Sequence, residues 1–367
     1  MKIKKLLIPL LIAGFVFHLT FLPALADQEK KEDQKEKSTQ VVIPEKVKTA
    51  LNQGIQSGET RQDIPFQLID YFYFLARQNM HTIFIFKTKN SNLEYTPVSP
   101  VIDAIVPATE EEAPPVEEAE APTKLETNTT CYLQFHQLKD DTPGDIVKEI
   151  FIPVDFEVKK DSYEPDKEIF CTIGYPLPPG KYLLALAIVS EDMEKIGTQY
   201  LEFSLPGPET FQDKLDTTSI FFVNKSKRIS SPEIQPEVHK GYFTYSVMQI
   251  EPKFENVFHQ GDNIELFFFV LGAGQDSQRK CDIEINYSVF QGKKEVIRYE
   301  KTTYNAPLII QSLPPLKSIV IVKKPGEKEG KREVRDLKPG EYTFKMDIKD
   351  NISEKTVTKS IDFQVIE

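Results

Sequence analysis

The sequence of 367 residues has no tryptophan, three cysteines and fewer basic than acidic residues, 45 against 56. Three cysteines are too few for a small disulfide-rich scaffold. The net charge of −11 argues against a nucleic-acid partner and against electrostatic adsorption to anionic lipid, since both need a basic surface. Without tryptophan, the chain lacks the side chain that is best suited to stacking on sugar rings.

Long apolar runs are also scarce, and the one at the N-terminus has the features of an export signal. Residues 1–5 are basic, Leu6–Leu22 is mostly apolar, and Ala24-Leu25-Ala26 fits a cleavage site. An uncleaved anchor is the alternative. Loss of residues 1–26 would remove three lysines and change the net charge to −14. We therefore expect an exported protein, periplasmic or extracellular, that does not insert into a membrane once the signal is cleaved.

The chain beyond the signal is rich in short strand patterns, with aromatic and β-branched residues between Gly and Pro turns. This pattern predicts an all-β protein of two tandem immunoglobulin-like antiparallel β-sandwiches, preceded by a short helix. The predicted organisation is a signal peptide (1–26), a disordered charged spacer (27–40), a short helix and lead-in (41–62), a first sandwich (63–206) with a disordered acidic Pro/Glu insertion (107–126), a linker (207–241) and a second sandwich (242–367).

A repeat supports two related domains. Residues 177–205 and 337–365 align without a gap, with nine of 29 positions identical. Each copy opens with Leu-x-Pro-Gly-x-Tyr, for which we expect a type II turn with positive φ at glycine, followed by a strand that opens with tyrosine. This resembles the tyrosine corner of immunoglobulin-like and fibronectin type III-like sandwiches. The structural turn residues are Pro179, Gly180, Tyr182, Pro339, Gly340 and Tyr342.

The two copies differ on the outward face of the strand after this turn. In the second copy that face is polar, whereas in the first it is apolar and consists of Leu183, Ala185, Ala187 and Val189. A strand that is apolar on both faces is covered on both. Two interpretations remain open: the helix near 44–56 or the neighbouring domain lies on it, or the four residues form a face for a partner chain.

The whole chain after the signal resembles the accessory β-sandwich tail regions of secreted bacterial GWxTD-domain and von Willebrand factor A-related proteins. The resemblance rests on residues 178–206, on HQGDNIELFFFVLG and on LKPGEYTFKMDIKD. The signature motifs of the head domains, GWxTD and Asp-x-Ser-x-Ser, are absent from the sequence. The resemblance implies accessory sandwiches without a head domain.

Few residue patterns in the sequence indicate a catalytic, metal or cofactor site. There is no Gly-x-Ser-x-Gly elbow and no Gly-rich phosphate loop, and the four histidines beyond the signal never occur at spacing four. Asp140, Asp141 and Asp145 lie in a stretch that favours a hairpin turn over a calcium loop. Cys131 and Cys171 could pair, whereas Cys281 has no evident partner. We therefore predict no catalytic residue, no metal site and no cofactor.

Two functions stay open. The first is a non-catalytic binding or assembly module of the bacterial envelope or extracellular space, with another envelope or extracellular protein as partner. The alternative is an accessory carbohydrate-binding protein, because a glycan could stack on exposed tyrosines. The candidate tyrosines are Tyr95, Tyr163, Tyr299 and Tyr304.

Overall fold

The computed structural model describes residues 43–76, 79–98, 123–322 and 331–367. Residues 1–40 and 41–367 are separate units, and all described residues belong to the second. The predicted signal peptide (1–26) and charged spacer (27–40) therefore lie outside the described residues. No helix among the described residues is long and apolar enough to cross a membrane.

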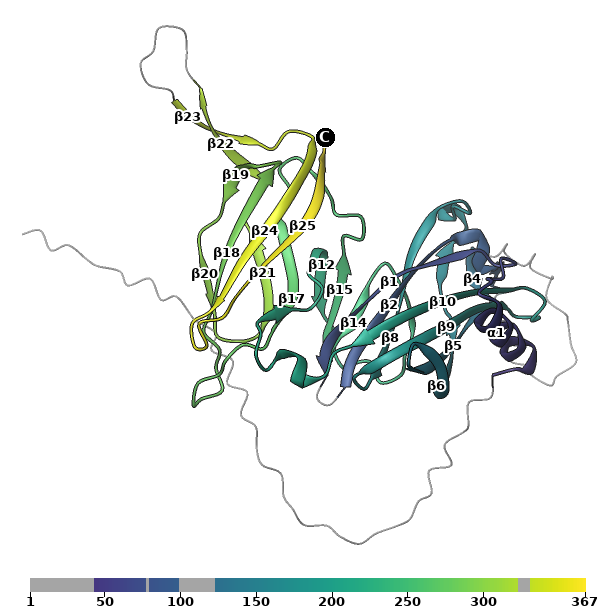
Figure 1. The fold of residues 1–367 in the computed structure, drawn as a ribbon. Coiled ribbons are helices and arrows are strands. Elements are labelled where there is room, and N and C mark those ends of the chain that lie inside the picture. The colour runs from purple at the N-terminus through teal and green to yellow at the C-terminus, as the bar shows by residue number, and fades with distance from the viewer. Residues whose placement is uncertain (1–42, 77–78, 99–122, 323–330) are drawn as a thin grey trace, which may run out of the picture. The chain divides into compact units, whose positions relative to one another are not determined.

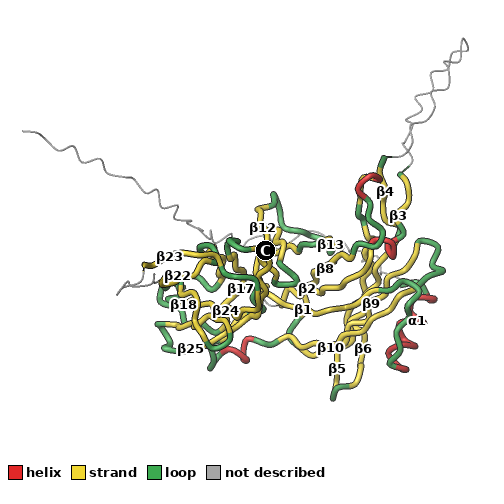
Figure 2. The backbone as a smooth tube through the Cα atoms, turned by 90° about the horizontal axis from the view of Figure 1, so that it is seen from above, coloured by secondary structure: helices red, strands yellow, loops and turns green. Residues whose placement is uncertain are grey.

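The predicted all-β class is confirmed. Strands dominate the described chain, and one α-helix, α1 (Glu45–Ser57), precedes them (Figures 1 and 2). In the described ranges three short 3₁₀ helices interrupt the strands, namely η1 (Asn90–Leu93), η2 (Lys160–Ser162) and η3 (Pro208–Phe211). The strands pair in antiparallel ladders, and among the described residues there is one parallel pair, in which a strand of three residues joins a strand of eleven in the second sandwich.

The first sandwich consists of two four-stranded sheets in the orders β1-β2-β8-β13 and β10-β9-β5-β6. A small three-stranded sheet, β3-β4-β7, accompanies them. The strands are β1 (Phe66–Ala76), β2 (Asn79–Lys89), β3 (Tyr95–Pro97), β4 (Lys124–Thr127), β5 (Thr129–Lys139), β6 (Thr142–Val154), β7 (Glu157–Lys159), β8 (Glu168–Leu177), β9 (Gly180–Ser190), β10 (Ile196–Leu205) and β13 (Val238–Lys240).

The second sandwich has the sheet orders β11-β17-β12-β15-β14, with β21 on β17, and β16-β25-β24-β18-β19, with β20 on β18; β22 and β23 form a separate hairpin. The strands are β11 (Asp216–Thr217), β12 (Phe221–Arg228), β14 (Phe243–Tyr245), β15 (Met248–Pro252), β16 (Val257–His259), β17 (Ile264–Leu271), β18 (Ile283–Gln291), β19 (Lys294–Arg298), β20 (Thr302–Tyr304), β21 (Leu308–Leu313), β22 (Lys317–Val322), β23 (Lys331–Asp336), β24 (Gly340–Asp350) and β25 (Thr356–Ile366).

The prediction of a linker at 207–241 is wrong, because this segment contains three strands. β11 and β12 pair with β17 and so belong to the second sandwich, while β13 pairs with β8 and adds a fourth strand to the first. The polar composition of this segment favours a linker. Phe222 and Val238 are nevertheless buried in the cores of the second and the first sandwich.

The predicted acidic insertion, 107–126, ends earlier than expected. Residues 124–126 belong to β4, which pairs with β3 and β7, and Leu125 is buried. Leu125 is the single apolar residue of 124–126, so the composition of this stretch gives no strand signal. The remainder of the predicted insertion, 107–122, lies outside the described residues.

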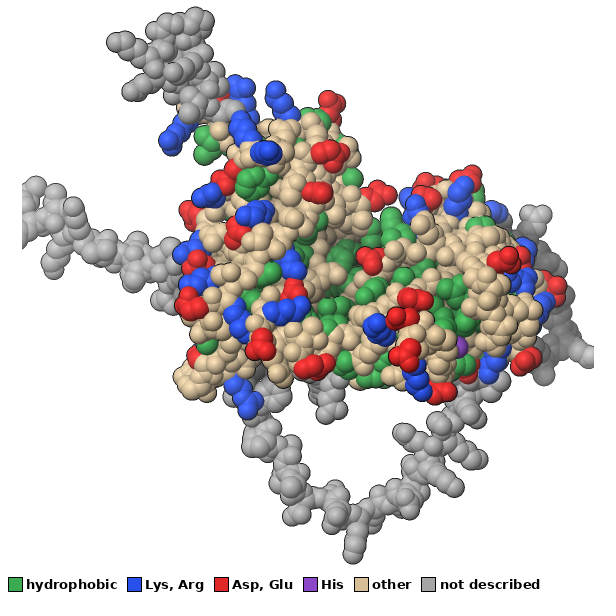
Figure 3. Space-filling view, viewed as in Figure 1, with side chains coloured by type: hydrophobic (Ala, Val, Ile, Leu, Met, Phe, Trp, Pro, Cys, Tyr) green, Lys and Arg blue, Asp and Glu red, His purple; other side chains and the backbone are tan. Residues whose placement is uncertain are grey.

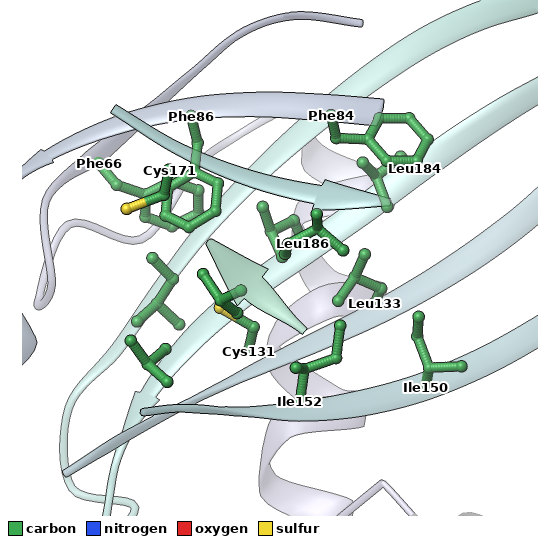
Figure 4. Packing of buried hydrophobic residues seen from close by; sticks show 14 of the residues in the cluster. Phe66, Phe84, Phe86, Cys131, Leu133, Ile150, Ile152, Cys171, Leu184 and Leu186 are labelled. Atoms are coloured by element: carbon green, nitrogen blue, oxygen red, sulfur yellow. The ribbon is translucent and has the colours of Figure 1, made fainter. Parts of the chain in front are cut away.

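The core of the first sandwich is built from both of its sheets, and Figure 4 shows part of it. Cys131 comes from β5 and Cys171 from β8, so the two thiols belong to opposite sheets. Both are buried, and all three cysteines of the chain are free thiols. Burial raises the pKa of Cys171 to about 12, which keeps this thiol protonated and poorly reactive.

The sheet β1-β2-β8-β13 is apolar on both faces because each face packs on a different core. Phe84 and Phe86 of β2 point into the first sandwich, whereas Ile83 and Ile85 point the other way. The second group joins an aromatic cluster that also contains Phe243 and residues of β17. The alternation of strand side chains thus lets one sheet serve two cores.

Candidate functional site

The apolar outward face of β9 is covered by α1. Ala185, Ala187 and Val189 form one buried cluster with Val47 and Leu51 of the helix. Leu183 is buried as well, with 7% of its surface exposed. The interpretation of these four residues as a face for a partner chain is therefore wrong, since all four are buried. The covering helix explains the apolar character of Ala185, Ala187 and Val189.

Gly54 and Tyr200 fix α1 on this face. Gly54 lies within α1, which ends at the C-cap Gly58, with φ of 74°. The Tyr200 hydroxyl donates to the carbonyl of Leu51 at 3.1 Å. Beside the apolar contacts, Lys48 lies 3.5 Å from Glu149 of β6, which also accepts a hydrogen bond from the buried Gln134.

The predicted corner residues take equivalent places in the two sandwiches. Tyr182 donates to the carbonyl of Pro178 at 2.9 Å, and Tyr342 donates to that of Lys338 at 2.8 Å. This backbone contact four residues upstream is the expected feature of a tyrosine corner. Pro179 and Pro339 occupy the position before the glycine in each corner.

The turn type differs from the prediction. Gly180 has φ of 158° and Gly340 has φ of 153°, whereas the third residue of a type II turn has φ of about 80°. Both glycines already belong to the strands that follow, β9 and β24. In the first corner glycine has a steric role, because a Cβ on Gly180 would stand 3.1 Å from the Tyr182 hydroxyl.

The outer sheet of the first sandwich ends in a long edge strand, β6, which pairs with β5 and has no strand partner on its other side among the described residues. β6 exposes Ile146, Val147 and Phe151, with 44%, 45% and 50% of their surfaces accessible. Pro143 and Pro153 lie near its two ends. Such an edge offers backbone groups and apolar side chains to another chain.

Elsewhere on the surface, charges of both signs are mixed. Figure 3 shows Lys, Arg, Asp and Glu side chains interspersed over the visible face, with apolar side chains gathered in the region of β1 and β10. β1 exposes Ile69 and Leu75, with 41% and 38% of their surfaces accessible. The face seen in Figure 3 therefore has no large patch of only positive or only negative side chains.

The four tyrosines that are candidates for sugar stacking do not form one platform. Tyr95 and Tyr163 are neighbours in the first sandwich, but their rings are tilted by 52°. Tyr299 is buried in the second sandwich, and Tyr304 is half-buried and shares a hydrogen bond of 2.7 Å with the Tyr287 hydroxyl. A flat exposed aromatic surface is thus not built from these residues.

The acidic turn at 139–145 has the properties of a hairpin. Asp140 and Asp141 have φ of 52° and 57°, which allows the chain to reverse between β5 and β6. Asp141 lies 3.0 Å from the ammonium of Lys181, and Asp145 lies 3.4 Å from that of Lys139. These carboxylates are paired with lysines and do not converge on one point.

A different group of polar residues does converge, in the segment that the sequence predicts to be a linker. Glu233, Glu237 and His239 present ligand atoms within 4.8 Å of one another, the one such group among the described residues. Nε2 of His239 donates to Oε2 of Glu233 at 2.8 Å, and Thr244 of β14 donates to the same oxygen. The backbone N–H of Glu237 donates to Oε1 of Glu233 at 2.9 Å.

These contacts determine the charge of Glu233. Burial pushes the pKa of this carboxyl upward, but the hydrogen bonds from His239, Thr244 and the Glu237 backbone outweigh it and leave the pKa below its ordinary value. Glu233 is therefore a carboxylate at neutral pH. It joins β13 of the first sandwich to β14 of the second, because His239 and Thr244 lie on these two strands.

A cavity of about 550 Å³ opens beside this cluster. Glu233, Glu237, His239, Tyr242 and Thr244 all contribute to its lining. The imidazole of His239 is buried and stacks on the Tyr242 ring, with centroids 4.5 Å apart. Nε2 of His81 of β2 lies 3.2 Å from the carbonyl oxygen of Thr244, the residue whose hydroxyl donates to Glu233.

The sequence contains the local signal for this cluster, Glu-x-x-x-Glu-x-His, inside a segment of polar composition. This spacing has no fixed geometry by itself, and only the folded loop brings the three side chains together. Comparison with known proteins adds no assignment: the sequence matches no protein-family model and no curated protein.

Proposed function

We propose that the protein is a non-catalytic binding or assembly module of the bacterial envelope or extracellular space, and that it binds an extended segment of another protein along β6. The observation that carries this proposal is the edge strand β6 with its exposed Ile146, Val147 and Phe151. An added strand gains main-chain hydrogen bonds from an edge, and alternate side chains give specificity.

The composition of β6 limits where a partner strand could pair. Proline has no backbone N–H to donate, so Pro143 and Pro153 bracket a stretch of about nine residues in which every residue has both backbone groups. That stretch contains all three exposed apolar side chains. The predicted export signal and the resemblance to accessory tail regions of secreted bacterial proteins favour an extracytoplasmic partner.

The test is capture of a partner from an envelope extract, followed by measurement of direct binding between the two purified proteins. The edge variant carries Ile146→Lys and Phe151→Lys, because lysine on an edge strand opposes strand addition. The matched control is Ile310→Lys on β21, where the side chain is equally accessible, 51%. Both variants should retain the parent's circular dichroism spectrum.

A partner that binds the parent and the Ile310→Lys variant, and binds the edge variant at least tenfold more weakly, would support the proposal. A partner that binds all three equally would contradict it, since the apolar edge would then have no role. The carbohydrate-binding alternative has no comparable feature in its favour, because its four tyrosines are not assembled on one surface.

A further inference from the structure

The cluster of Glu233, Glu237 and His239 has the residue types of a transition-metal site. A neutral imidazole nitrogen and carboxylate oxygens are ligands that Zn²⁺ accepts, at about 2.0–2.2 Å from the ion. Their ligand atoms lie within 4.8 Å of one another, close enough for one ion to contact all three after small side-chain rotations. The shortest of these separations, 2.8 Å between Nε2 and Oε2, is that of the hydrogen bond between them. An ion would take the place of the Nε2 proton and move the two atoms to about 3.3–3.6 Å apart, the spacing of two ligands on one tetrahedral ion.

The surroundings hold two of these side chains in place. Thr244 donates to Oε2 of Glu233, and the Tyr242 ring stacks on the imidazole of His239. Such outer contacts orient the ligands at metal sites. Glu237 is the exposed member, and its backbone N–H contact with Glu233 keeps the loop between them closed.

The charge of the cavity independently favours a cation. Two carboxylates face a volume of about 550 Å³, and no lysine or arginine occurs among the described residues that line it. The remaining polar lining residues are neutral, namely Ser231, Gln235, Tyr242, Thr244 and Gln249. The cavity thus presents two carboxylates and no cationic lysine or arginine, and water in it can complete the coordination of an ion.

We propose that Glu233, Glu237 and His239 bind one divalent transition-metal ion, with Zn²⁺ as the best match. The ion joins Glu237 to the Glu233 carboxylate, which already connects β13 with β14 through His239 and Thr244, so it stabilises the junction of the two sandwiches. This site is independent of the proposed partner edge on β6, since none of its residues belongs to that strand.

The test is titration of the metal-stripped whole chain with Zn²⁺ by calorimetry, repeated with Co²⁺ by visible absorption. The deciding variant is Glu237→Gln, because this side chain is exposed and its loss leaves the contacts of Glu233 with His239 and Thr244 intact. The matched control is Glu255→Gln, an exposed glutamate outside the cluster. A second variant, His239→Gln, removes the nitrogen ligand.

We expect one saturable Zn²⁺ per chain in the parent and in Glu255→Gln, together with a higher Tm in excess Zn²⁺. Glu237→Gln should weaken this binding at least tenfold and abolish the rise in Tm, and a folded His239→Gln should lose the intense Co²⁺ bands of a low-coordinate site. Equal binding by Glu237→Gln and Glu255→Gln would overturn the proposal, as would the absence of saturable binding by the parent. If His239→Gln does not fold, the Glu237→Gln comparison alone decides.

Discussion

Gly54 of α1 and Tyr200 of β10 are in direct contact, and a Cβ at position 54 would lie 2.0 Å from the Tyr200 hydroxyl. The backbone oxygen of Glu59 is a further obstacle, at 2.6 Å. The helix therefore approaches the sheet as closely as it does because residue 54 has no side chain. This contact explains why a residue that is unfavourable inside a helix occurs in α1.

The first prediction concerns this contact. Gly54→Ala should lower the free energy of unfolding by about 1–3 kcal/mol, the usual cost of overpacking, despite the better helix propensity of alanine. The measurement is urea unfolding followed by circular dichroism. Gln53→Ala, at the exposed neighbouring position, is the control and should change stability little. A Gly54→Ala variant as stable as the parent would show that α1 does not pack on Tyr200.

The second prediction addresses the face of β9 under α1. Ala187→Glu should lower the free energy of unfolding by about 3–5 kcal/mol, because Ala187 has no exposed surface and a carboxylate there would have no partner. The measurement is thermal unfolding together with limited proteolysis of the α1 segment. Thr343→Glu, at the outward position of the equivalent strand β24, is the control, since this residue is partly exposed. Normal stability of Ala187→Glu would make this face a candidate partner surface again.

The third prediction concerns the two tyrosine corners. Tyr182→Phe and Tyr342→Phe should each lower the free energy of unfolding by about 1 kcal/mol, which is the net contribution of one hydrogen bond to the backbone. The double variant should show the sum, because the two residues lie in different cores. Urea unfolding of the four proteins measures this. If only one of the two variants were less stable than the parent, the two tyrosine corners would not contribute equally to stability, despite their shared sequence.

The fourth prediction is a pH dependence at Asp350, which lies at the turn between β24 and β25. Burial raises the pKa of this carboxyl, but hydrogen bonds from Ser353 and from the backbone N–H groups of Gly274 and Ile352 outweigh it and lower the pKa below 3.8. A lowered folded-state pKa means stability that is complete above the unfolded-state value near 4 and is lost as the pH falls through the folded-state pKa.

Asp350→Asn should therefore be less stable than the parent at pH 7, by about 1–3 kcal/mol, because an amide cannot accept all of these hydrogen bonds. The difference in free energy of unfolding between the parent and Asp350→Asn should become smaller as the pH falls below 4. Unfolding curves from pH 3 to pH 7 provide the measurement, and Asp362→Asn at an exposed position of β25 is the control. A constant difference across this range would contradict the assignment.

The fifth prediction distinguishes the two states of Cys131 and Cys171 that the sequence leaves open. As buried free thiols, all three cysteines should react slowly with a thiol reagent in the native protein and rapidly in denaturant. The measurement counts thiols in the unreduced, denatured chain. Three reactive thiols are expected, and a single one would mean that Cys131 and Cys171 are joined by a disulfide.

Local sequence patterns are sufficient for the fold class and for the repeat. Alternating side chains in β24 and the Pro-Gly-x-Tyr corners depend on residues within one strand or turn, so they can be recognised without any distant contact. For the apolar outward face of β9, the same kind of local pattern leaves two alternatives: a cover within this chain, or a partner chain. A strand that is apolar on both faces must be covered, but the pattern does not specify what covers it.

The sequence by itself thus determined two β-sandwiches, their shared corner and a helix near residue 45. Tertiary structure alone decided that α1 lies on β9, that β12 and β13 belong to sheets, and that Glu233, Glu237 and His239 meet. The reason is that each of these outcomes depends on the folded arrangement of the chain and not on the residues of one strand or turn. A short strand such as β13 has too few residues for a periodic signal, and its place is fixed by the sheet edge that it joins.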